Sequence, residues 1–182
     1  MPNWTQNIVT FSHPDSTKII DIIKAAEFAS KNSGDNFLNV FVPRPISESE
    51  NWYDWNTSNW GTKWDVHPNI TEVNNYSVTL SFDTAWAPPI QFYRTIIEKH
   101  GYEVLAFYNE EGMAFAGVFD NGHDDYYEYA DMDSDEIEEY LPSNLNEMFN
   151  ISSNRADWEQ EQMDDDGQPD ESQEWESFDP DC

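Results

Sequence analysis

The chain has 182 residues, which suits a single domain of ordinary size with an appendage. It contains 37 acidic and 8 basic residues, and its formal net charge at pH 7 is -29. A molecule this negative repels phosphate backbones and anionic lipids and attracts basic surfaces, so we expect no direct binding to nucleic acid. Aromatic residues make up 15% of the chain, a content typical of a folded domain and not of a disordered chain.

Cysteine content and hydropathy indicate the compartment. The one cysteine is Cys182, so an internal disulfide cannot form and the fold does not require an oxidising environment. Residues 1–5 lack the basic start and apolar stretch of a signal peptide, and no run reaches the ~18 apolar residues of a membrane span. We therefore expect a cytoplasmic protein with no membrane partner.

The negative charge is concentrated in the last third of the chain. Residues 1–119 contain 14 acidic and 7 basic residues, whereas residues 120–182 contain 23 acidic residues and one basic residue. We therefore expect a folded domain over residues 1–130, a short helical segment over 131–154 and an acidic C-terminal tail over 155–182.

The first half of the predicted domain contains a strand, a helix and a second strand. Residues 7–12 alternate in hydropathy as a strand does. A helix follows, starting near Pro14, and residues 37–42 then form a short apolar predicted strand. Residues 43–75 form a long irregular insert. The apolar residues at helical spacing are Ile19, Ile20, Ile23 and Ala26.

The second half begins with a strictly alternating strand over residues 76–82 and a helix over residues 90–100. The buried face of the strand is predicted to carry Tyr76, Val78, Leu80 and Phe82. The apolar stripe of the helix is predicted to be Ile90, Tyr93, Ile96 and Ile97. Gly101 ends the helix, because glycine is the preferred residue just past a helix C-terminus.

A hairpin closes the predicted domain. Residues 104–108 and 113–119 form two strands joined by a short loop, and the turn at Asn121 and Gly122 leads into one further candidate strand. This order of elements predicts an α+β fold with a ferredoxin-like split β-α-β antiparallel sheet and two helices on one face. The Trp-rich insert and an acidic helical or irregular C-terminal extension are added to that plan.

Several local strings in the domain resemble a known family. They are Pro2-Asn3-Trp4 followed by Asn7, Trp52-Tyr53-Asp54-Trp55, Asn59-Trp60-Gly61-Thr62-Lys63-Trp64-Asp65, Thr84-Ala85-Trp86-Ala87-Pro88-Pro89, Glu111-Gly112-Met113 and Phe115-Ala116-Gly117. In order and spacing they resemble the YubB-like ferredoxin-fold proteins of bacteriophages and plasmids, over roughly residues 2–125. The resemblance implies a fold and no catalytic residues. The chain departs from the family pattern in having Thr5 where a cysteine is common, and in its long acidic C-terminus.

Large aromatic rings are the most distinctive feature of the insert. They are Trp52, Tyr53, Trp55, Trp60 and Trp64, with Trp86 beyond the insert. The simplest interpretation is that they form a small core where the insert folds onto the sheet. Rigid rings also suit a protein interface. Base stacking is a weaker alternative, because only Arg44 and Lys63 lie nearby to hold a phosphate backbone.

An acidic motif near residue 131 raises the question of a metal site. Asp131, Asp133 and Asp135 match the opening of a calcium-binding EF-hand loop, but Glu136 stands where glycine is needed and Pro142 where a bidentate glutamate is needed. Asp133 and Glu136 instead predict a helix N-cap. The apolar stripe of that helix is predicted to be Ile137, Tyr140 and Leu141. We expect no metal and no cofactor.

Motifs for catalysis are lacking in the sequence. The four histidines show no metal-ligand spacing, and no nucleophile or phosphate-loop motif occurs. Abundant carboxylates without an apolar pocket do not indicate acid-base catalysis. We therefore assign no catalytic residues and expect a protein that is not an enzyme.

The tail over residues 155–182 holds 12 acidic residues interrupted by aromatic ones. One interpretation is a solvated, disordered tail. The other is an array of carboxylates that mimics the charge of a nucleic acid and occupies a basic groove, with aromatic anchors. The candidate partner-binding residues are Asp164, Asp165, Asp166, Asp170, Glu171, Glu174, Trp175 and Phe178.

Charge and resemblance together predict a phage-type accessory protein that binds and inhibits a host enzyme acting on nucleic acid, as a counter-defence or antitoxin-like factor in the host cytoplasm. The expected partner has a basic surface. The alternative is a small-ligand or regulatory module, in which the sheet and the insert enclose a pocket lined by Trp55, Trp60 and Trp86.

Overall fold

The computed structural model describes the backbone of residues 3–31 and 37–165 and the side chains of residues 3–31 and 37–163. The chain divides into two compact units, Met1–Asp131 and Met132–Cys182.

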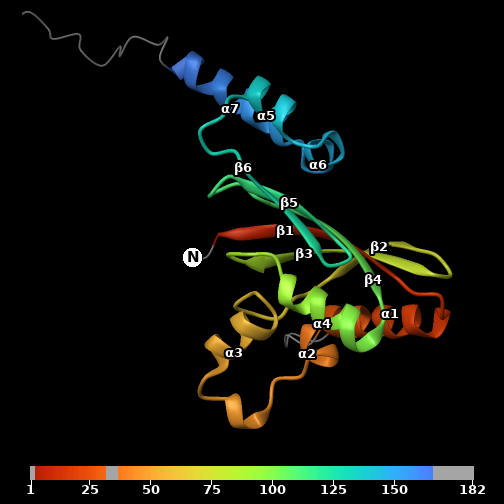
Figure 1. The fold of residues 1–182 in the computed structure, drawn as a ribbon. Coiled ribbons are helices and arrows are strands. Elements are labelled where there is room, and N and C mark those ends of the chain that lie inside the picture. The colour runs from red at the N-terminus through yellow and green to blue at the C-terminus, as the bar shows by residue number, and fades with distance from the viewer. Residues whose placement is uncertain (1–2, 32–36, 166–182) are drawn as a thin grey trace, which may run out of the picture. The chain divides into compact units, whose positions relative to one another are not determined.

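The first unit is an α+β structure built on one antiparallel sheet (Figure 1). Its six strands are β1 (Trp4–Ser12), β2 (Asn69–Val73), β3 (Ser77–Ala85), β4 (Glu103–Glu110), β5 (Phe115–Asp120) and β6 (His123–Glu128). Their order in the sheet is β2-β3-β1-β4-β5-β6. The helices are α1 (Ser16–Lys31), α2 (Phe37–Phe41), α3 (Trp52–Asn59) and α4 (Ile90–His100), with a 3-10 turn at Ile46–Glu48.

The core lies between one face of this sheet and the helices, all of which are on the same side in Figure 1. Val9 of β1 stands opposite Leu80 of β3 and Ala106 of β4, and all three are fully buried. Ile22 of α1 and Ile96 of α4 belong to the same core. Burial of this face provides most of the driving force for folding, at roughly 25 cal/mol per Å² of apolar surface.

The prediction of a strand over residues 37–42 was wrong, because Phe37–Phe41 is the short helix α2. The carboxylate of Asp65 accepts hydrogen bonds from the backbone N–H groups of Leu38 at 2.6 Å and Asn39 at 2.9 Å. It thereby satisfies donors that the first turn of a helix leaves open. The strand that the predicted topology required is β2, which lies within residues 43–75 at the exposed edge of the sheet.

Two residues of the predicted buried faces are exposed. Tyr76 precedes β3 and is 59% exposed, and Ile20 of α1 is 46% exposed while Ile22 is buried. The rest of the second half agrees with prediction. Helix α4 ends at Gly101, whose φ of 74° is the left-handed conformation that glycine adopts readily.

Close packing of β4 against β5 depends on a glycine. Tyr108 of β4 stands opposite Gly117 of β5 in the register, is fully buried, and donates its hydroxyl hydrogen to Asp124 at 2.8 Å. A Cβ atom on Gly117 would lie 2.2 Å from the Tyr108 ring and 2.6 Å from the backbone oxygen of Asp125. Only a residue without a side chain fits there.

We expect Gly117→Ala to lower the free energy of unfolding by about 3 kcal/mol, because the buried ring and a backbone carbonyl must both move. Urea denaturation measures the change. Gly122→Ala is the control, since nothing lies within 4 Å of its added Cβ and it loses only the about 1 kcal/mol of a positive φ. Equal losses in the two variants would contradict this packing.

The second unit contains three helices: α5 (Ser134–Tyr140), α6 (Ser143–Phe149) and α7 (Ile151–Asp165). The predicted cap is confirmed. Asp133 accepts from the backbone N–H of Glu136, whose side chain accepts from the backbone N–H of Asp133. Tyr140 is 46% exposed, so its predicted place in the apolar stripe was wrong. Helix α7 runs continuously through residue 155, which was predicted to be the first residue of the acidic tail. The buried apolar residues are Ile137, Leu141, Leu145, Phe149 and Ile151.

Candidate binding site

The first unit contains a cavity of about 630 Å³ at the end of the sheet where β1 begins. Three of its residues lie side by side on adjacent strands, because Gln6 of β1 stands opposite Asp83 of β3 and Asn109 of β4. The complete lining is Trp4, Gln6, Trp64, Asp65, Val66, His67, Asp83, Ala85, Asn109, Glu110 and Glu111. The cavity therefore combines indole rings with several carboxylates.

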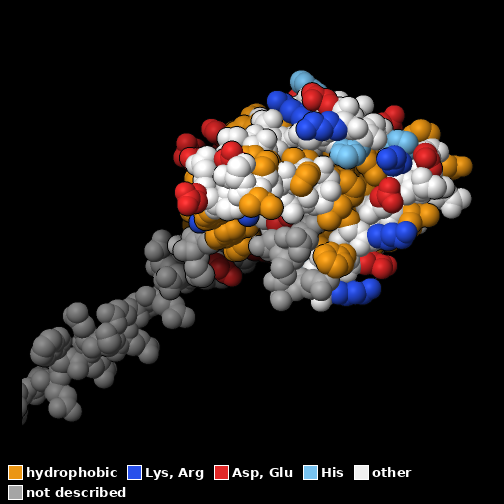
Figure 2. Space-filling view, turned by 90° about the horizontal axis from the view of Figure 1, so that it is seen from below, with side chains coloured by type: hydrophobic (Ala, Val, Ile, Leu, Met, Phe, Trp, Pro, Cys, Tyr) orange, Lys and Arg blue, Asp and Glu red, His pale blue; other side chains and the backbone are white. Residues whose placement is uncertain are grey.

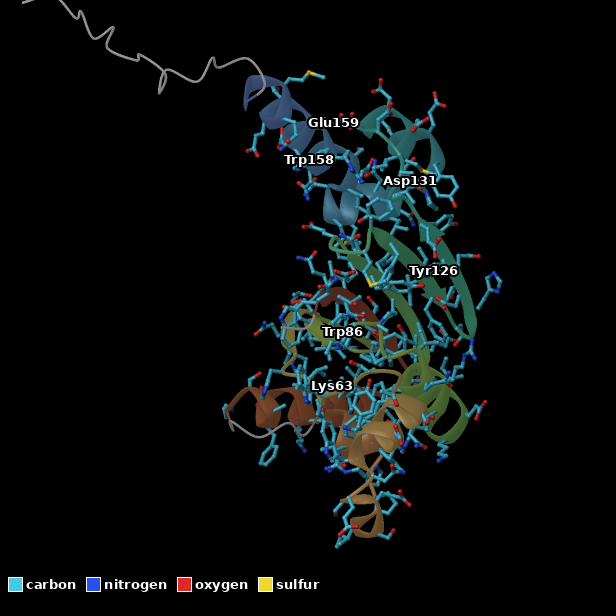
Figure 3. The ribbon with its side chains drawn as sticks, turned by 90° about the vertical axis from the view of Figure 1, so that its left-hand side faces the viewer. Lys63, Trp86, Tyr126, Asp131, Trp158 and Glu159 are labelled. Carbon is cyan, nitrogen blue, oxygen red and sulfur yellow. The ribbon has the colours of Figure 1, made fainter. Side chains whose placement is uncertain are left out.

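The aromatic part of the lining consists of Trp4 and Trp64, whose ring centroids are 6.0 Å apart with a 38° angle between planes. Trp4 is 50% exposed. The Nζ atom of Lys63 lies 4.3 Å from the centroid of the Trp64 ring, within cation–π range. Lys63, which is labelled in Figure 3, is not among the residues that line the cavity. The Trp64 ring thus already interacts with one cation.

Two of the carboxylates in the lining serve the fold. Asp65 binds the N-terminus of α2 and also accepts from the backbone N–H of Val66 at 2.8 Å. Glu110 is 2% exposed and accepts from the backbone N–H groups of Gly112 at 2.8 Å and Met113 at 2.7 Å. Their charges are stabilised by these donors. They shape the cavity and contribute negative potential to it.

Asp83 differs from these two carboxylates. The residue is exposed, its carboxylate makes neither a hydrogen bond nor an ion pair within the described residues, and partial desolvation raises its pKa above the usual range. Desolvation of a charged group without compensation is unfavourable. Asp83 is therefore the acid in this cavity that a ligand would stabilise most.

Asn109 presents a second polar group without a complete set of partners. Its side chain is 1% exposed, and its Oδ1 atom accepts a hydrogen bond from the Tyr129 hydroxyl at 2.7 Å. Its Nδ2 atom has no hydrogen-bond partner among the described residues. Buried polar atoms are nearly always paired, so this donor is a candidate contact for an acceptor on a ligand.

We expect Asp83→Asn to be more stable than the wild type at pH 7. Because the pKa of Asp83 is raised in the folded chain, the unfolded chain releases this proton at lower pH, and the wild type loses stability as pH rises through that interval. The advantage of the variant should vanish below about pH 3, where the carboxyl is protonated in both states. Thermal unfolding across pH measures it.

Asp120→Asn, which removes an exposed carboxylate from β5, reports the general benefit of lowering the negative charge. An Asp83→Asn stability profile that coincides with that of Asp120→Asn would show that the partial desolvation of Asp83 has no energetic consequence.

The aromatic residues of the predicted set lie in different environments, some buried and some exposed. Trp60 is 3% exposed, donates its indole N–H to the Val42 carbonyl at 2.9 Å, and meets the Trp55 ring edge-to-face at 5.5 Å. Tyr53 and Trp86 are 48% and 46% exposed. Trp52, Trp60 and Trp64 line a second cavity of about 520 Å³, where Arg44 donates to Asn56 at 2.9 Å.

Neither of these two cavities is lined by Trp55 or Trp86, so the predicted pocket between Trp55, Trp60 and Trp86 corresponds to neither of them. Trp86 follows β3 with a φ of 74°, which strains a bulky residue. The sequence interpretation missed Trp4, Asp83 and Asn109. All three lie just outside the strands that the sequence predicted over residues 7–12, 76–82 and 104–108, and the alignment of the longer strands brings them together.

The proposed partner-binding acids of the tail fall mainly beyond the described part of the chain. Asp164 and Asp165 end α7, and their side chains lie outside the description. Asp166, Asp170, Glu171, Glu174, Trp175 and Phe178 also lie outside the described residues.

The side chain of Glu159 connects helix α7 to the start of helix α5 (Figure 3). The carboxylate of Glu159 accepts from the backbone N–H of Ser134 at 3.1 Å and from its hydroxyl at 2.8 Å. An anion at a helix N-terminus also interacts favourably with the helix dipole. Arg155 lies 5.6 Å from the centroid of the Trp158 ring.

Glu159→Ala should lower the opening free energy of α5 by about 1–2 kcal/mol, because both hydrogen bonds at its first residue are lost. Native-state hydrogen exchange of the α5 amides measures this change. Glu161→Ala removes an exposed acid from the same helix and should leave α5 protection unchanged. Equal protection in the two variants would mean that Glu159 does not hold α5.

The described residues hold no group of three or more His, Cys, Asp or Glu side chains suited to a metal ion. Among the helices of residues 3–31 and 37–165, none has the length and apolar character needed to cross a bilayer.

Comparison with known proteins gives a fold relationship alone. No family model matches the chain, and no curated protein does. The crystal structure of protein api92 from Yersinia pseudotuberculosis, assigned to the family DUF1281, superposes with a TM-score of 0.50 at 10% sequence identity. The match covers 71% of this chain and 99% of that one. The two proteins thus share an α+β fold.

Proposed function

We propose that this chain is a phage-type accessory protein that binds and inhibits a host enzyme acting on nucleic acid, through contact with a basic surface. The observation that carries the proposal is the charge of the second unit. Residues 132–182 contain 18 acidic residues and one basic residue. Such a surface attracts basic proteins and accelerates their association.

The exposed surface of α7 supports this proposal. Asp157 and Glu161 are both exposed and stand four residues apart, so they face the same side of the helix. Like charges at this spacing destabilise a helix by a few tenths of a kcal/mol. A basic partner would remove that repulsion, and the acidic residues beyond α7 would extend the same charge array.

The first unit presents a different surface. Five of its seven basic residues lie on α1 and α4, namely Lys18, Lys24, Lys31, Arg94 and Lys99. The face shown in Figure 2 accordingly carries Lys and Arg side chains beside acidic ones. Residues 1–131 contain 19 acidic and 7 basic residues, so the first unit is also negative, but its acidic excess is smaller than that of residues 132–182. The proposal therefore assigns partner binding to the second unit.

The family and the ferredoxin-like arrangement belong to the same proposal. In support, β3 lies between β1 and β2 in the sheet, α1 connects β1 with the segment leading to β2, and α4 connects β3 with β4. This is the order expected of a split β-α-β unit. The YubB-like strings supply the phage or plasmid setting. A chain whose one cysteine is Cys182 suits the host cytoplasm.

The test uses the full chain and a chain ending at Asp165, which keeps α7 and its contact with α5 intact. Each is immobilised and exposed to bacterial host lysate at low and high salt, and the retained protein is identified and purified. We expect the partner to bind the full chain in competition with DNA, with affinity falling steeply as salt rises. Deletion of residues 166–182 should weaken binding by several kcal/mol.

Undiminished binding by the shortened chain would remove the tail from the mechanism, and a retained protein indifferent to DNA would remove nucleic-acid mimicry. A second shortened chain ending at Asn154 also lacks Glu159. Comparison of the two deletions separates the contribution of α7 from that of the tail.

A small-ligand or regulatory module is the second candidate function, and the cavity beside Trp4 favours it. Its volume of about 630 Å³ lies within the range of ligand pockets, roughly 300–1,000 Å³. It combines apolar rings with a few polar groups, as such pockets do. The two functions are compatible if the ligand belongs to the partner.

A further inference from the structure

We infer that the cavity beside Trp4 is a binding site for an alkylguanidinium group, as carried by an arginine side chain in an extended peptide. This inference rests on the proposed function in one respect, which is that the partner is a basic protein. It concerns a different surface, because every residue that lines the cavity belongs to the first unit.

The charge of the ligand follows from Asp83. Its carboxylate has no hydrogen-bond or ionic partner within the described residues, and it stands beside Gln6 on the adjacent strand. Asp65 and Glu110 add negative charge from the same lining while their own oxygens are occupied by backbone donors. A cation would pair with the partly desolvated carboxylate of Asp83, and a guanidinium can donate two parallel hydrogen bonds to a carboxylate.

The flat shape of the ligand follows from the two indole rings. Trp4 and Trp64 both line the cavity with their centroids 6.0 Å apart, and Trp4 is half-exposed. A guanidinium is planar and weakly hydrated, so it stacks on aromatic rings more readily than an ammonium does. The aliphatic stem of arginine would cover apolar surface of the same rings.

The peptide context follows from Asn109. Its Nδ2 atom is a buried donor without a partner, whereas a guanidinium has donors only. A guanidinium therefore cannot pair with this donor, whereas an acceptor on another part of the ligand can. A main-chain carbonyl of the peptide that carries the arginine supplies one, and the cavity is large enough to hold more than a single side-chain group.

Isothermal titration of the full chain with N-acetyl-arginine N-methylamide tests the inference. We expect a dissociation constant of about 0.1–1 mM, the range for a ligand of this size. The matching citrulline derivative, which has the same shape without the charge, should bind at least about tenfold more weakly. Agmatine retains the guanidinium but lacks the carbonyl, and it should bind about threefold or more weakly.

Variants assign the binding to this cavity. Asp83→Asn should weaken binding of the arginine derivative about tenfold, and Trp4→Leu about threefold to tenfold. Asp120→Asn, which removes an exposed acid elsewhere on the sheet, should leave it unchanged. Circular dichroism verifies that each variant is folded, and Asp83→Asn is expected to be at least as stable as the wild type.

Equal binding of the arginine and citrulline derivatives would overturn recognition of the cation. Binding unaffected by Asp83→Asn would overturn its placement in this cavity, and agmatine binding as tight as that of the capped arginine would overturn the peptide context. These titrations use neither the host partner nor residues 166–182. A negative titration result therefore does not affect the conclusion from the tail deletion. A negative tail-deletion result likewise does not affect the conclusion from the titrations.

Discussion

The pairing of β1 with a strand on each side is the constraint on which the first unit depends. β1 aligns with β3 from Trp4 to Ser12 but with β4 only from Gln6 to Ser12. Residues such as Val9 and Phe11 on one face are buried against the helices, and the alternate residues lie on the other face. Because β1 extends past its pairing with β4, Trp4 lies at the end of the sheet beside Trp64. The same register therefore builds the core and assembles the cavity.

Carboxylates have two different roles in this acidic chain. Asp65, Glu110 and Glu159 each accept hydrogen bonds from backbone N–H groups, and they hold α2, the loop after β4 and the start of α5. Their charges stabilise local structure. Asp83 and the exposed acids of α7 have no such structural role. These acids are therefore the ones to which the two proposals assign binding.

Local sequence patterns predicted most of the helices and strands. They did not predict that Phe37–Phe41 is helical or that the additional strand is Asn69–Val73. Alternation in β3 and helical spacing in α4 depend on neighbours within one segment, so a strand and a helix were predicted there. Residues 37–42 have the apolar content of a strand, yet they are helical because Asp65, more than twenty residues away, binds their N–H groups. The site was harder to predict. Trp64 belonged to the predicted aromatic set and Trp4 to a family-like string that implied no site, whereas Asp83 and Asn109 carried no local motif.

The sequence by itself determined the charge, its concentration in the last third, the mixed α+β class and the cap of α5, because each is a property of composition or of residues a few positions apart. Only the tertiary structure decided that β2 and not residues 37–42 forms the edge strand, and that Trp4, Asp83 and Asn109 share one cavity. Those outcomes depend on strand register, which aligns residues up to about a hundred positions apart. A pattern confined to one segment does not contain that alignment.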